Sequence, residues 1–179
     1  MIGLKRGNVL LESHDENWKL IALDTIDTLR TICKDTAIDI QHIGSTAIEQ
    51  IHAKPIIDIV VGVKQLEDVQ SLLPSLEQIN VIFRGQDVLN QFLFVLNDST
   101  QDMRTHHIHI VIHNGLDWNN YINFRDYLNS NHIKAQEYDQ LKLDLADKYP
   151  TDRSSYTSSK TSLICQLLEE ANQWKLNNL

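Results

Sequence analysis

The sequence has little of several residue types, and each shortage excludes a class of protein. Of its 179 residues only two are cysteines. Cys33 and Cys165 lie far apart within apolar helical patterns, so we interpret both as reduced core thiols rather than as a disulfide or a nucleophile. The first residues contain no long apolar run, so no signal peptide is expected. No apolar stretch reaches the roughly 18 residues of a membrane span, so we expect a cytoplasmic protein.

Basic residues are also scarce. Sixteen lysines and arginines face 24 aspartates and glutamates, which gives a formal net charge of −8. Proteins that bind nucleic acids or acidic membranes usually present a basic surface, so neither partner is expected. A small basic pocket for one nucleotide remains compatible with this average.

The hydrophobic pattern predicts an α+β fold, a mixed sheet with flanking helices and a helical C-terminal third. We expect a single domain over 1–179, with a sheet core over about 14–113 and C-terminal helices over about 116–176. Apolar residues at three-and-four spacing indicate helices, and short β-branched runs indicate strands. The predicted helices are 15–34, 65–77, 117–130, 134–148 and 153–176, and the predicted strands are 36–43, 55–63, 79–84, 90–97 and 106–113.

Two polar features interrupt this pattern. The turn Gly44-Ser45-Thr46 follows the first strand and precedes a helix-like stretch, so its unpaired N–H groups could receive an anion. The same residues also serve as ordinary helix caps. Asp58 lies among isoleucines and valines, where an unpaired carboxylate is costly to bury. It is either a site residue or half of an ion pair with Lys54 or an arginine of the helical part.

The segment HHIHIVIH (106–113) offers a set of histidines. Strand alternation places His107, His109 and His113 on one face, and His106 on the other face with isoleucines. His107 and His109 could bind a metal together with Asp58, and such a donor set favours Zn²⁺, Mn²⁺ or Fe²⁺ over Mg²⁺. Alternatively they serve as phosphate donors or acid/base groups, or they lie on a polar strand face that the C-terminal helices cover.

The helical third adds a set of cations and one tyrosine. They either clamp an acidic ligand in a cleft between sheet and helices, or they are ordinary charges on helix faces. The set consists of Arg104, Arg125, Lys142, Arg153, Tyr156 and Lys160.

Several motifs in order resemble the GrpB family, which is assigned to the nucleotidyltransferase superfamily of DNA polymerase beta. They are HIGSTAI (42–48), KPIIDIVVGV (54–63), RTHHIHIV (104–111), FRDYL (124–128), YDQLKLDLA (138–146) and DRSSYTSSK (152–160). The resemblance implies a nucleotidyltransferase-like mixed sheet. It also implies that the Gly44-Ser45 turn receives a nucleotide's phosphates and that strand carboxylates hold divalent metal ions.

This chain departs from the superfamily pattern at one place and from the usual sequence of its relatives at two others. Asp58 is followed by Ile59 and Val60, so the usual second carboxylate is missing. Gln41 stands where many relatives carry a glutamate. Ile48-Glu49-Gln50 replaces the usual Val-Pro-Gly, which predicts a longer or more polar helix after the turn.

We therefore expect a nucleotidyl group to pass from a nucleoside triphosphate, or a related phosphorylated small molecule, to a small acceptor. Asp58, His107 and His109 are the predicted catalytic and metal-binding residues, with Mg, Mn or Zn as the metal. A non-catalytic nucleotide- or metal-binding relative and a metal-dependent phosphoester hydrolase are the alternatives, and the oligomeric state stays open. The predicted phosphate-binding residues are Gly44, Ser45, Thr46, Lys54, Arg125, Lys142 and Lys160.

Overall fold

The structure is a computed structural model that describes residues 2–5, 7–88, 90–98 and 103–178. Within these residues a sheet of six strands forms the centre, in the order β2-β3-β6-β5-β4, with β1 paired to β6. The α+β class predicted from the sequence is confirmed. The strands are β1 (Leu4–Lys5), β2 (Ala37–Ile43), β3 (Ile57–Val63), β4 (Val81–Val88), β5 (Gln91–Asp98) and β6 (Met103–Ile112).

The two central strands run parallel, whereas the other neighbours in the sheet are antiparallel. In the β3–β6 register Asp58 lies opposite His107, and Val60 lies opposite His109. The side chains of β3 are almost all buried, as expected for a strand covered on both faces. The parallel pairing therefore brings the lone strand carboxylate beside the histidine strand.

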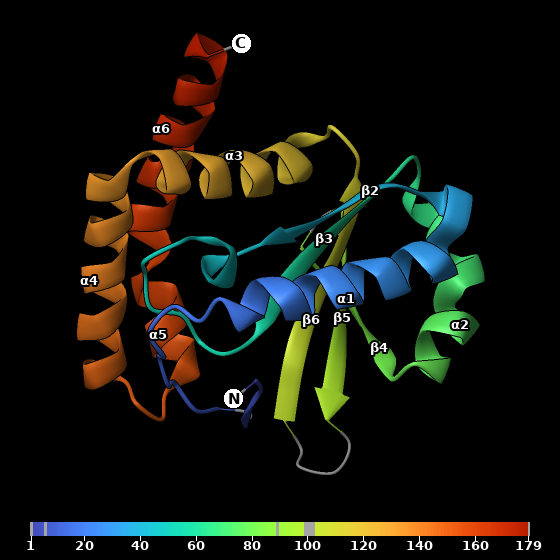
Figure 1. Cartoon of the computed structure of the whole chain (residues 1–179), viewed down its shortest axis with the longest axis horizontal. Coiled ribbons are helices and arrows are strands. Elements are labelled where there is room, and N and C mark those ends of the chain that lie inside the picture. Colours follow the sequence, from blue (N-terminus) through green and yellow to red (C-terminus); the bar gives the residue numbers. More distant parts are fainter. Residues whose placement is uncertain (1, 6, 89, 99–102, 179) are drawn as a thin grey trace.

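One face of the sheet carries α1 (Asn17–Cys33), whose buried stripe packs on Ile59, Ile108 and their neighbours. Figure 1 shows α1 crossing the sheet, with α2 (Leu73–Gln78) near its C-terminal end. The segment predicted as one helix over 65–77 is instead a 3₁₀ helix over Leu66–Leu72 followed by the short α2. Pro74 near the start of α2 explains part of this division, because a proline is accommodated best in the first helical turn.

The other face carries the C-terminal helices. Trp118 of α3 packs against Val60 and Val111 of the sheet, and α3, α4 and α6 share a second core with Ile48 and Ile51. Figure 1 shows α4, α5 and α6 standing together beside one end of the sheet. The helices are α3 (Leu116–Ser130), α4 (His132–Lys148), α5 (Arg153–Ser159) and α6 (Thr161–Asn177).

The predicted helix over 153–176 is divided at Lys160. The N–H of Lys160 donates to the carbonyl of Thr157, which tightens the last turn of α5, and α6 then begins at Thr161. Asp152 caps α5 by accepting from the N–H of Ser155 at 3.0 Å. Lys160 thus sits at a bend, and its side chain points back over Tyr156.

The stretch after β2 is shorter than the sequence predicted. Gly44 is followed by a 3₁₀ helix of three residues, Ser45–Ala47, and not by a longer helix. The chain is drawn away because Ile48 and Ile51 are buried in the core of the C-terminal helices. The sequence reading also missed β1, whose two residues are too few to show a strand period.

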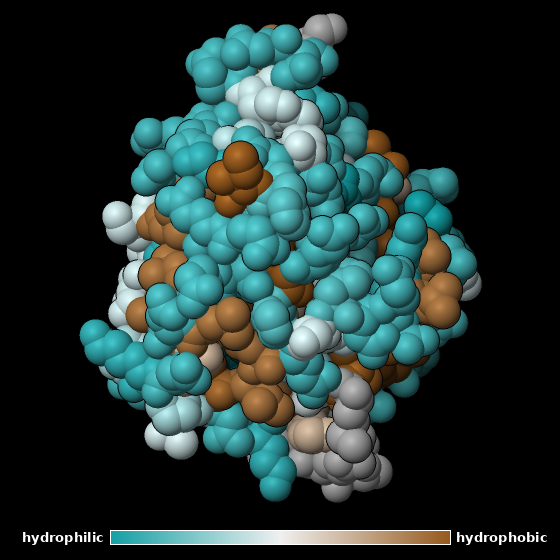
Figure 2. All heavy atoms as spheres, turned by 60° about the vertical axis from the view of Figure 1, so that its left-hand side comes forward, coloured by the Kyte–Doolittle hydropathy of each residue, from teal (hydrophilic) through white to brown (hydrophobic). Residues whose placement is uncertain are grey.

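The face in Figure 2, with the C-terminal helices turned forward, is largely hydrophilic, and its hydrophobic side chains form separate patches. Among the residues with described positions, none of the helices combines the length and apolar character of a membrane span.

Candidate functional site

The turn after β2 is built around a close approach of backbone and carboxylate. Gly44 has a φ of +72°, a left-handed conformation that favours glycine. A Cβ at this position would collide with the Asp58 carboxylate and would lie 2.9 Å from the Asp58 Cβ. The β2–β3 pairing sets Ile43 opposite Asp58, which brings the turn against the start of β3. Only glycine lets the turn and the carboxylate share this space.

Asp58 is paired with a histidine of the neighbouring strand. His107 Nδ1 lies 2.9 Å from Asp58 Oδ1, and His109 Nε2 lies 4.0 Å from the same oxygen. Burial alone would raise the pKa of Asp58, but the hydrogen bond from His107 and the nearby histidines outweigh it and lower this pKa. The carboxylate form of Asp58 is therefore favoured.

The remaining strand histidines divide between the two faces as predicted. The His109 ring packs 5.1 Å from the Tyr121 ring, and His113 packs 4.8 Å from Trp118. His106 lies on the α1 side, where its Nε2 is 3.0 Å from the Thr25 hydroxyl. Of the four histidines in β6 and just after it, His107 alone lines the cleft described next.

A cavity of about 270 Å³ lies between the Gly44 turn, the start of β3 and helices α4 and α5. Four cationic side chains line it among the described residues: Lys54, Lys142, Arg153 and Lys160. Two of them contact the ring of Tyr156, since Lys54 Nζ and Lys160 Nζ lie 4.4 and 4.5 Å from its centre. We call this cavity the cationic cleft. Its other lining residues are Leu11, Gly44, Ser45, Thr46, Ile56, Asp58, His107, Phe124, Tyr138, Tyr156 and Thr157.

The lysines of the cationic cleft are held in an unfavourable environment for charge. Burial lowers the pKa of Lys54 to about 7, with further repulsion from Lys160 and Arg153. Burial likewise lowers the pKa of Lys142 and of Lys160 to about 8 each. A folded protein gains nothing in stability from crowding desolvated cations. The negative charges of Asp58 and Asp139 act in the opposite direction but offset this effect only in part.

The three lysines differ in how they are held. Lys142 is buried on α4, where its Nζ lies 3.3 Å from Asp139 Oδ1 and donates to the carbonyl of His52. Lys54 and Lys160 instead lie over the ring of Tyr156. Lys142 thus also fixes the wall of the cleft, while Lys54 and Lys160 both contact the ring of Tyr156.

The cleft gathers most of the residues predicted from the sequence. They are Gly44, Ser45, Thr46, Lys54, Asp58, His107, Lys142 and Lys160.

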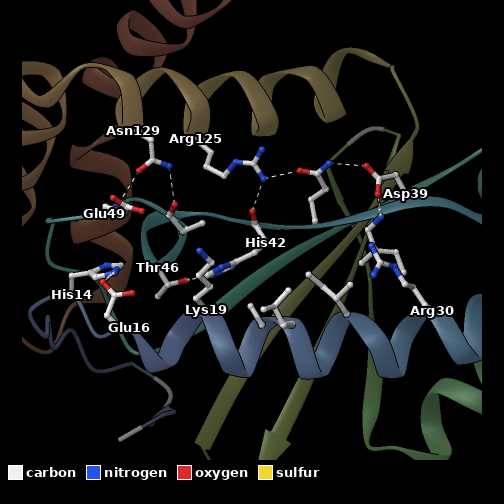
Figure 3. A pocket seen from close by; sticks show the side chains of 16 residues that line it. His14, Glu16, Lys19, Arg30, Asp39, His42, Thr46, Glu49, Arg125 and Asn129 are labelled. Carbon is white, nitrogen blue, oxygen red and sulfur yellow. Dashed lines mark hydrogen bonds and ion pairs between the residues drawn. The ribbon is translucent and has the colours of Figure 1, made fainter.

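Two predicted residues lie elsewhere. His109 packs on Tyr121 outside the lining of the cleft. Arg125 lines a second cavity of about 420 Å³ between α1, β2 and α3, where it donates to the Gln41 side chain and the His42 carbonyl (Figure 3).

His42 connects the two cavities. Its Nε2 lies 2.9 Å from the Thr46 hydroxyl, and Thr46 lines both cavities. Burial lowers the pKa of His42 to about 4, so this ring is neutral near pH 7. Figure 3 shows His42 and Thr46 in the middle of the second cavity, between α1 and α3. The second cavity carries charges of both signs, whereas most charged residues that line the first are cationic.

The metal ligands predicted from the sequence are Asp58, His107 and His109. Across the described residues, no group of three or more His, Cys, Asp or Glu side chains is arranged to hold a metal ion. Asp58 and His107 already satisfy each other, and a single carboxylate with imidazoles does not match the oxygen ligands that Mg²⁺ requires. The described side chains thus do not assemble a complete ligand set by themselves, and the predicted Mg, Mn or Zn ion stays a prediction.

The fold of the sheet and its helices is similar to that of nucleotidyltransferases. The structure of Cid1 in complex with its short product ApU superposes with a TM-score of 0.53 at 14% identity. The match covers 82% of this chain and 48% of that one. At this identity the similarity concerns the fold, which is nucleotidyltransferase-like.

The sequence comparisons identify a particular family within this fold. A family model described as GrpB protein matches residues 8–170, so the chain belongs to the GrpB family. The glutamate-rich protein GrpB of Alkalihalophilus pseudofirmus is 40% identical, covering 95% of this chain and 99% of that protein. The crystal structure of the conserved protein GrpB from Enterococcus faecalis superposes with a TM-score of 0.86 at 27% identity, over 93% of this chain and 99% of that one.

Proposed function

We propose that the cationic cleft binds the phosphates of a nucleoside triphosphate or a related phosphorylated small molecule, and that a nucleotidyl group passes from it to an acceptor hydroxyl. The observation that carries this proposal is the convergence of Lys54, Lys142, Arg153 and Lys160 on the Gly44–Ser45 turn. The whole chain has an excess of acidic residues, so this local concentration of positive charge stands out against its surface.

Binding a polyphosphate relieves the repulsion within the cleft. An anion near Lys54 and Lys160 favours their protonated forms, so above about pH 7 binding draws in protons that the free protein has partly lost. Charge-assisted hydrogen bonds from ammonium and guanidinium groups are the strongest that a phosphate receives from side chains. The cleft volume of about 270 Å³ matches the phosphate part of a nucleotide better than the whole molecule, so we expect the base to extend outside it.

The proton of a small acceptor that enters from solution needs a base, and the Asp58–His107 pair supplies one. Because Asp58 accepts from Nδ1 of His107, the ring keeps its proton there and presents Nε2 as the acceptor. The acceptor oxygen forms a bond to the α-phosphorus while the bond to the pyrophosphate oxygen breaks. The hydroxyl proton passes to His107, and pyrophosphate leaves into the lysines of the cleft.

The divalent metal implied by the resemblance stays a prediction. Asp58 is the side chain that would offer it a hard oxygen ligand, and phosphate and water would supply the others. A bound metal would stabilise charge on the transferring phosphate.

The proposal is tested by thermal shift and calorimetric titration with the four ribonucleoside triphosphates, each alone and with Mg²⁺, Mn²⁺ or Zn²⁺. At about one hundred times its dissociation constant, a bound nucleotide should stabilise the protein by about 2.7 kcal/mol. Lys160→Met should abolish this shift. Lys64→Met removes an exposed lysine outside the cleft and should leave the shift intact.

The absence of any shift in wild-type protein, or an equal shift in Lys160→Met, would overturn the assignment of the cleft. Release of pyrophosphate, followed with nucleotide labelled in the γ-phosphate, separates transfer from simple binding. If nucleotides bind and pyrophosphate never appears, the non-catalytic alternative replaces transfer. The single strand carboxylate, Asp58, is the feature that favours that alternative.

A further inference from the structure

The chain before α1 is pinned beside the cationic cleft by a short antiparallel bridge. Glu12 and Ala53 exchange both backbone hydrogen bonds, with N···O distances of 2.8 and 2.9 Å. The side chains that flank this pair therefore meet across the bridge, Leu11 with Lys54 and Ser13 with His52. Figure 1 shows the N-terminal segment and the loop after β2 running close to α4 and α5.

The second of these cross-strand pairs continues into a buried carboxylate. The Ser13 hydroxyl lies 3.3 Å from His52 Nε2, and His52 Nδ1 lies 2.8 Å from Asp139 Oδ2. Ser13 is exposed, His52 is partly buried, and Asp139 is only 5% exposed. An accessible hydroxyl, an imidazole and a buried carboxylate in this order form a hydrogen-bonded relay of the kind that activates nucleophilic serines.

The carboxylate is fixed from three sides, so the orientation of the histidine is fixed as well. Asp139 Oδ1 accepts from the backbone N–H of His52 at 2.7 Å and faces Lys142 Nζ at 3.3 Å. Its Oδ2 accepts from Nδ1 of the His52 ring, which places the imidazole proton on that nitrogen. Nε2 is then the basic nitrogen, and it points at the Ser13 hydroxyl.

The relay and the cationic cleft share one face of the bridge. Side chains alternate along an extended strand, so Leu11 and Ser13 point to the same side, as do His52 and Lys54. Leu11 and Lys54 line the cleft, and Ser13 and His52 lie one step of two residues away, about 7 Å along the strands. Lys142 belongs to both groups, because it lines the cleft and contacts Asp139.

From this arrangement we infer that Ser13 is a nucleophile that accepts the nucleotidyl group, and this inference rests on the proposed function of the cleft. The Ser13 oxygen bonds to the α-phosphorus, and the bond between that phosphorus and the pyrophosphate oxygen breaks. The hydroxyl proton moves to His52 Nε2, whose positive charge Asp139 stabilises. Pyrophosphate leaves among the lysines, and the product is a phosphodiester between Ser13 and a nucleoside. No further reactant is required.

The experiment incubates the full chain with each nucleoside triphosphate, labelled in either the α- or the γ-phosphate, and follows intact mass and peptide mapping. The α-label should become covalently attached to Ser13, and the γ-label should not. The protein mass should increase by one nucleotidyl group, which is a nucleoside monophosphate less one water. Ser13→Ala should abolish labelling. His52→Gln should slow it by at least about a hundredfold, the usual loss for a missing general base. Ser71→Ala removes a distant exposed serine and serves as the matched control.

Nucleotide binding is measured by thermal shift on the same samples, which separates this inference from the proposed function. If wild-type protein binds a nucleotide and carries no covalent label, the Ser13 inference fails and the cleft assignment stands. If the label maps to another hydroxyl, such as Thr157 in the cleft, the inference fails in the same way. If no nucleotide binds, both fall. Unchanged binding in Ser13→Ala and His52→Gln, together with lost labelling, assigns the effect to chemistry and not to folding.

Discussion

Individual lysines of the cationic cleft stand in different relations to the fold. Lys54 lies over the Tyr156 ring, and desolvation lowers its pKa to about 7. Lys142 is 1% exposed and bonds to Asp139 and to the His52 carbonyl. Burial of the Lys54 charge is therefore unfavourable for folding, whereas Lys142 also holds α4 against the loop after β2.

This difference predicts opposite effects of the same substitution. Lys54→Met should leave the free energy of unfolding near pH 7 unchanged or raised, because it removes a desolvated charge. Lys142→Met should lower it by about 1–3 kcal/mol, because Asp139 loses its buried partner. Urea unfolding of both variants measures the difference. Both should also lose affinity for nucleotides, and a Lys54→Met protein that is clearly less stable than wild type would contradict the assignment.

The lowered lysine pKa values predict how ligand binding depends on pH. Below about pH 6 all three cleft lysines are protonated, and between about pH 7 and about pH 9 the free protein loses these protons. A bound polyphosphate favours the protonated lysines, so above pH 7 binding must take up protons. Affinity should therefore fall as pH rises, by up to about tenfold per pH unit for each proton taken up. Calorimetry in buffers of different ionisation enthalpy measures the uptake, and a pH-independent affinity would contradict the role of the lysines.

At the scale of elements, the turn after β2 determines how closely the backbone at Gly44 approaches the Asp58 carboxylate. The turn lies against Asp58 because β2 and β3 are antiparallel neighbours. The lack of a side chain at Gly44 sets that distance. A change at this one turn should therefore affect both stability and ligand binding.

Gly44→Ala should lower the free energy of unfolding by about 1–2 kcal/mol for backbone strain and by a further 1–3 kcal/mol for the contact with Asp58. Gly85→Ala is the matched control, because Gly85 also has a positive φ, +104°, and a Cβ added there would meet no other atom within 4 Å. Urea unfolding of both variants gives the two parts. Equal losses would show that the approach of Gly44 to Asp58 does not matter.

The sequence predicted the large elements because their periods are long enough to read. The helix over 15–34 and the buried strand around Asp58 agree with α1 and β3 to within a few residues. It failed where tertiary packing overrode local preference, as in the three-residue 3₁₀ helix after Gly44, where Ile48 and Ile51 are pulled into another core.

The same limit applies to the candidate site. The Asp58–His107 pair was foreseeable from two motifs on neighbouring strands, and the resemblance supplied the turn and Lys142. The Ser13–His52–Asp139 relay was not foreseeable, because Ser13 and His52 are 39 residues apart and His52 and Asp139 are 87 residues apart. Of the three, only Asp139 falls within a motif. Arg125 was expected in one cleft with the lysines, but it lines the second cavity. A charge on a helix face does not reveal on which side of the turn its side chain will lie.

At the scale of the whole molecule, an acidic protein encloses a basic cleft. From the formal charge of −8 we expect polynucleotides to be repelled, and from the buried lysines we expect a compact anion to be attracted into the cleft.

This contrast predicts a difference between ligands. Nucleoside triphosphates should bind with moderate salt dependence, and single-stranded RNA should bind weakly, because its phosphates meet the acidic exterior. Fluorescence titrations with labelled mononucleotide and labelled oligonucleotide over a range of salt concentrations compare the two. Sub-micromolar binding of RNA at physiological salt would contradict the expectation.

The cationic cleft takes its residues from widely separated parts of the chain, from Leu11 at one end to Lys160 at the other. During synthesis, β3 leaves the ribosome long before β6, and the lysine at the α5–α6 bend follows later still. A nascent chain therefore has no complete anion site until nearly all of these elements have docked, because non-local contacts form only after their loops close. Nucleotide binding would then report the last stage of folding, and a bound nucleotide would protect the finished protein against reopening.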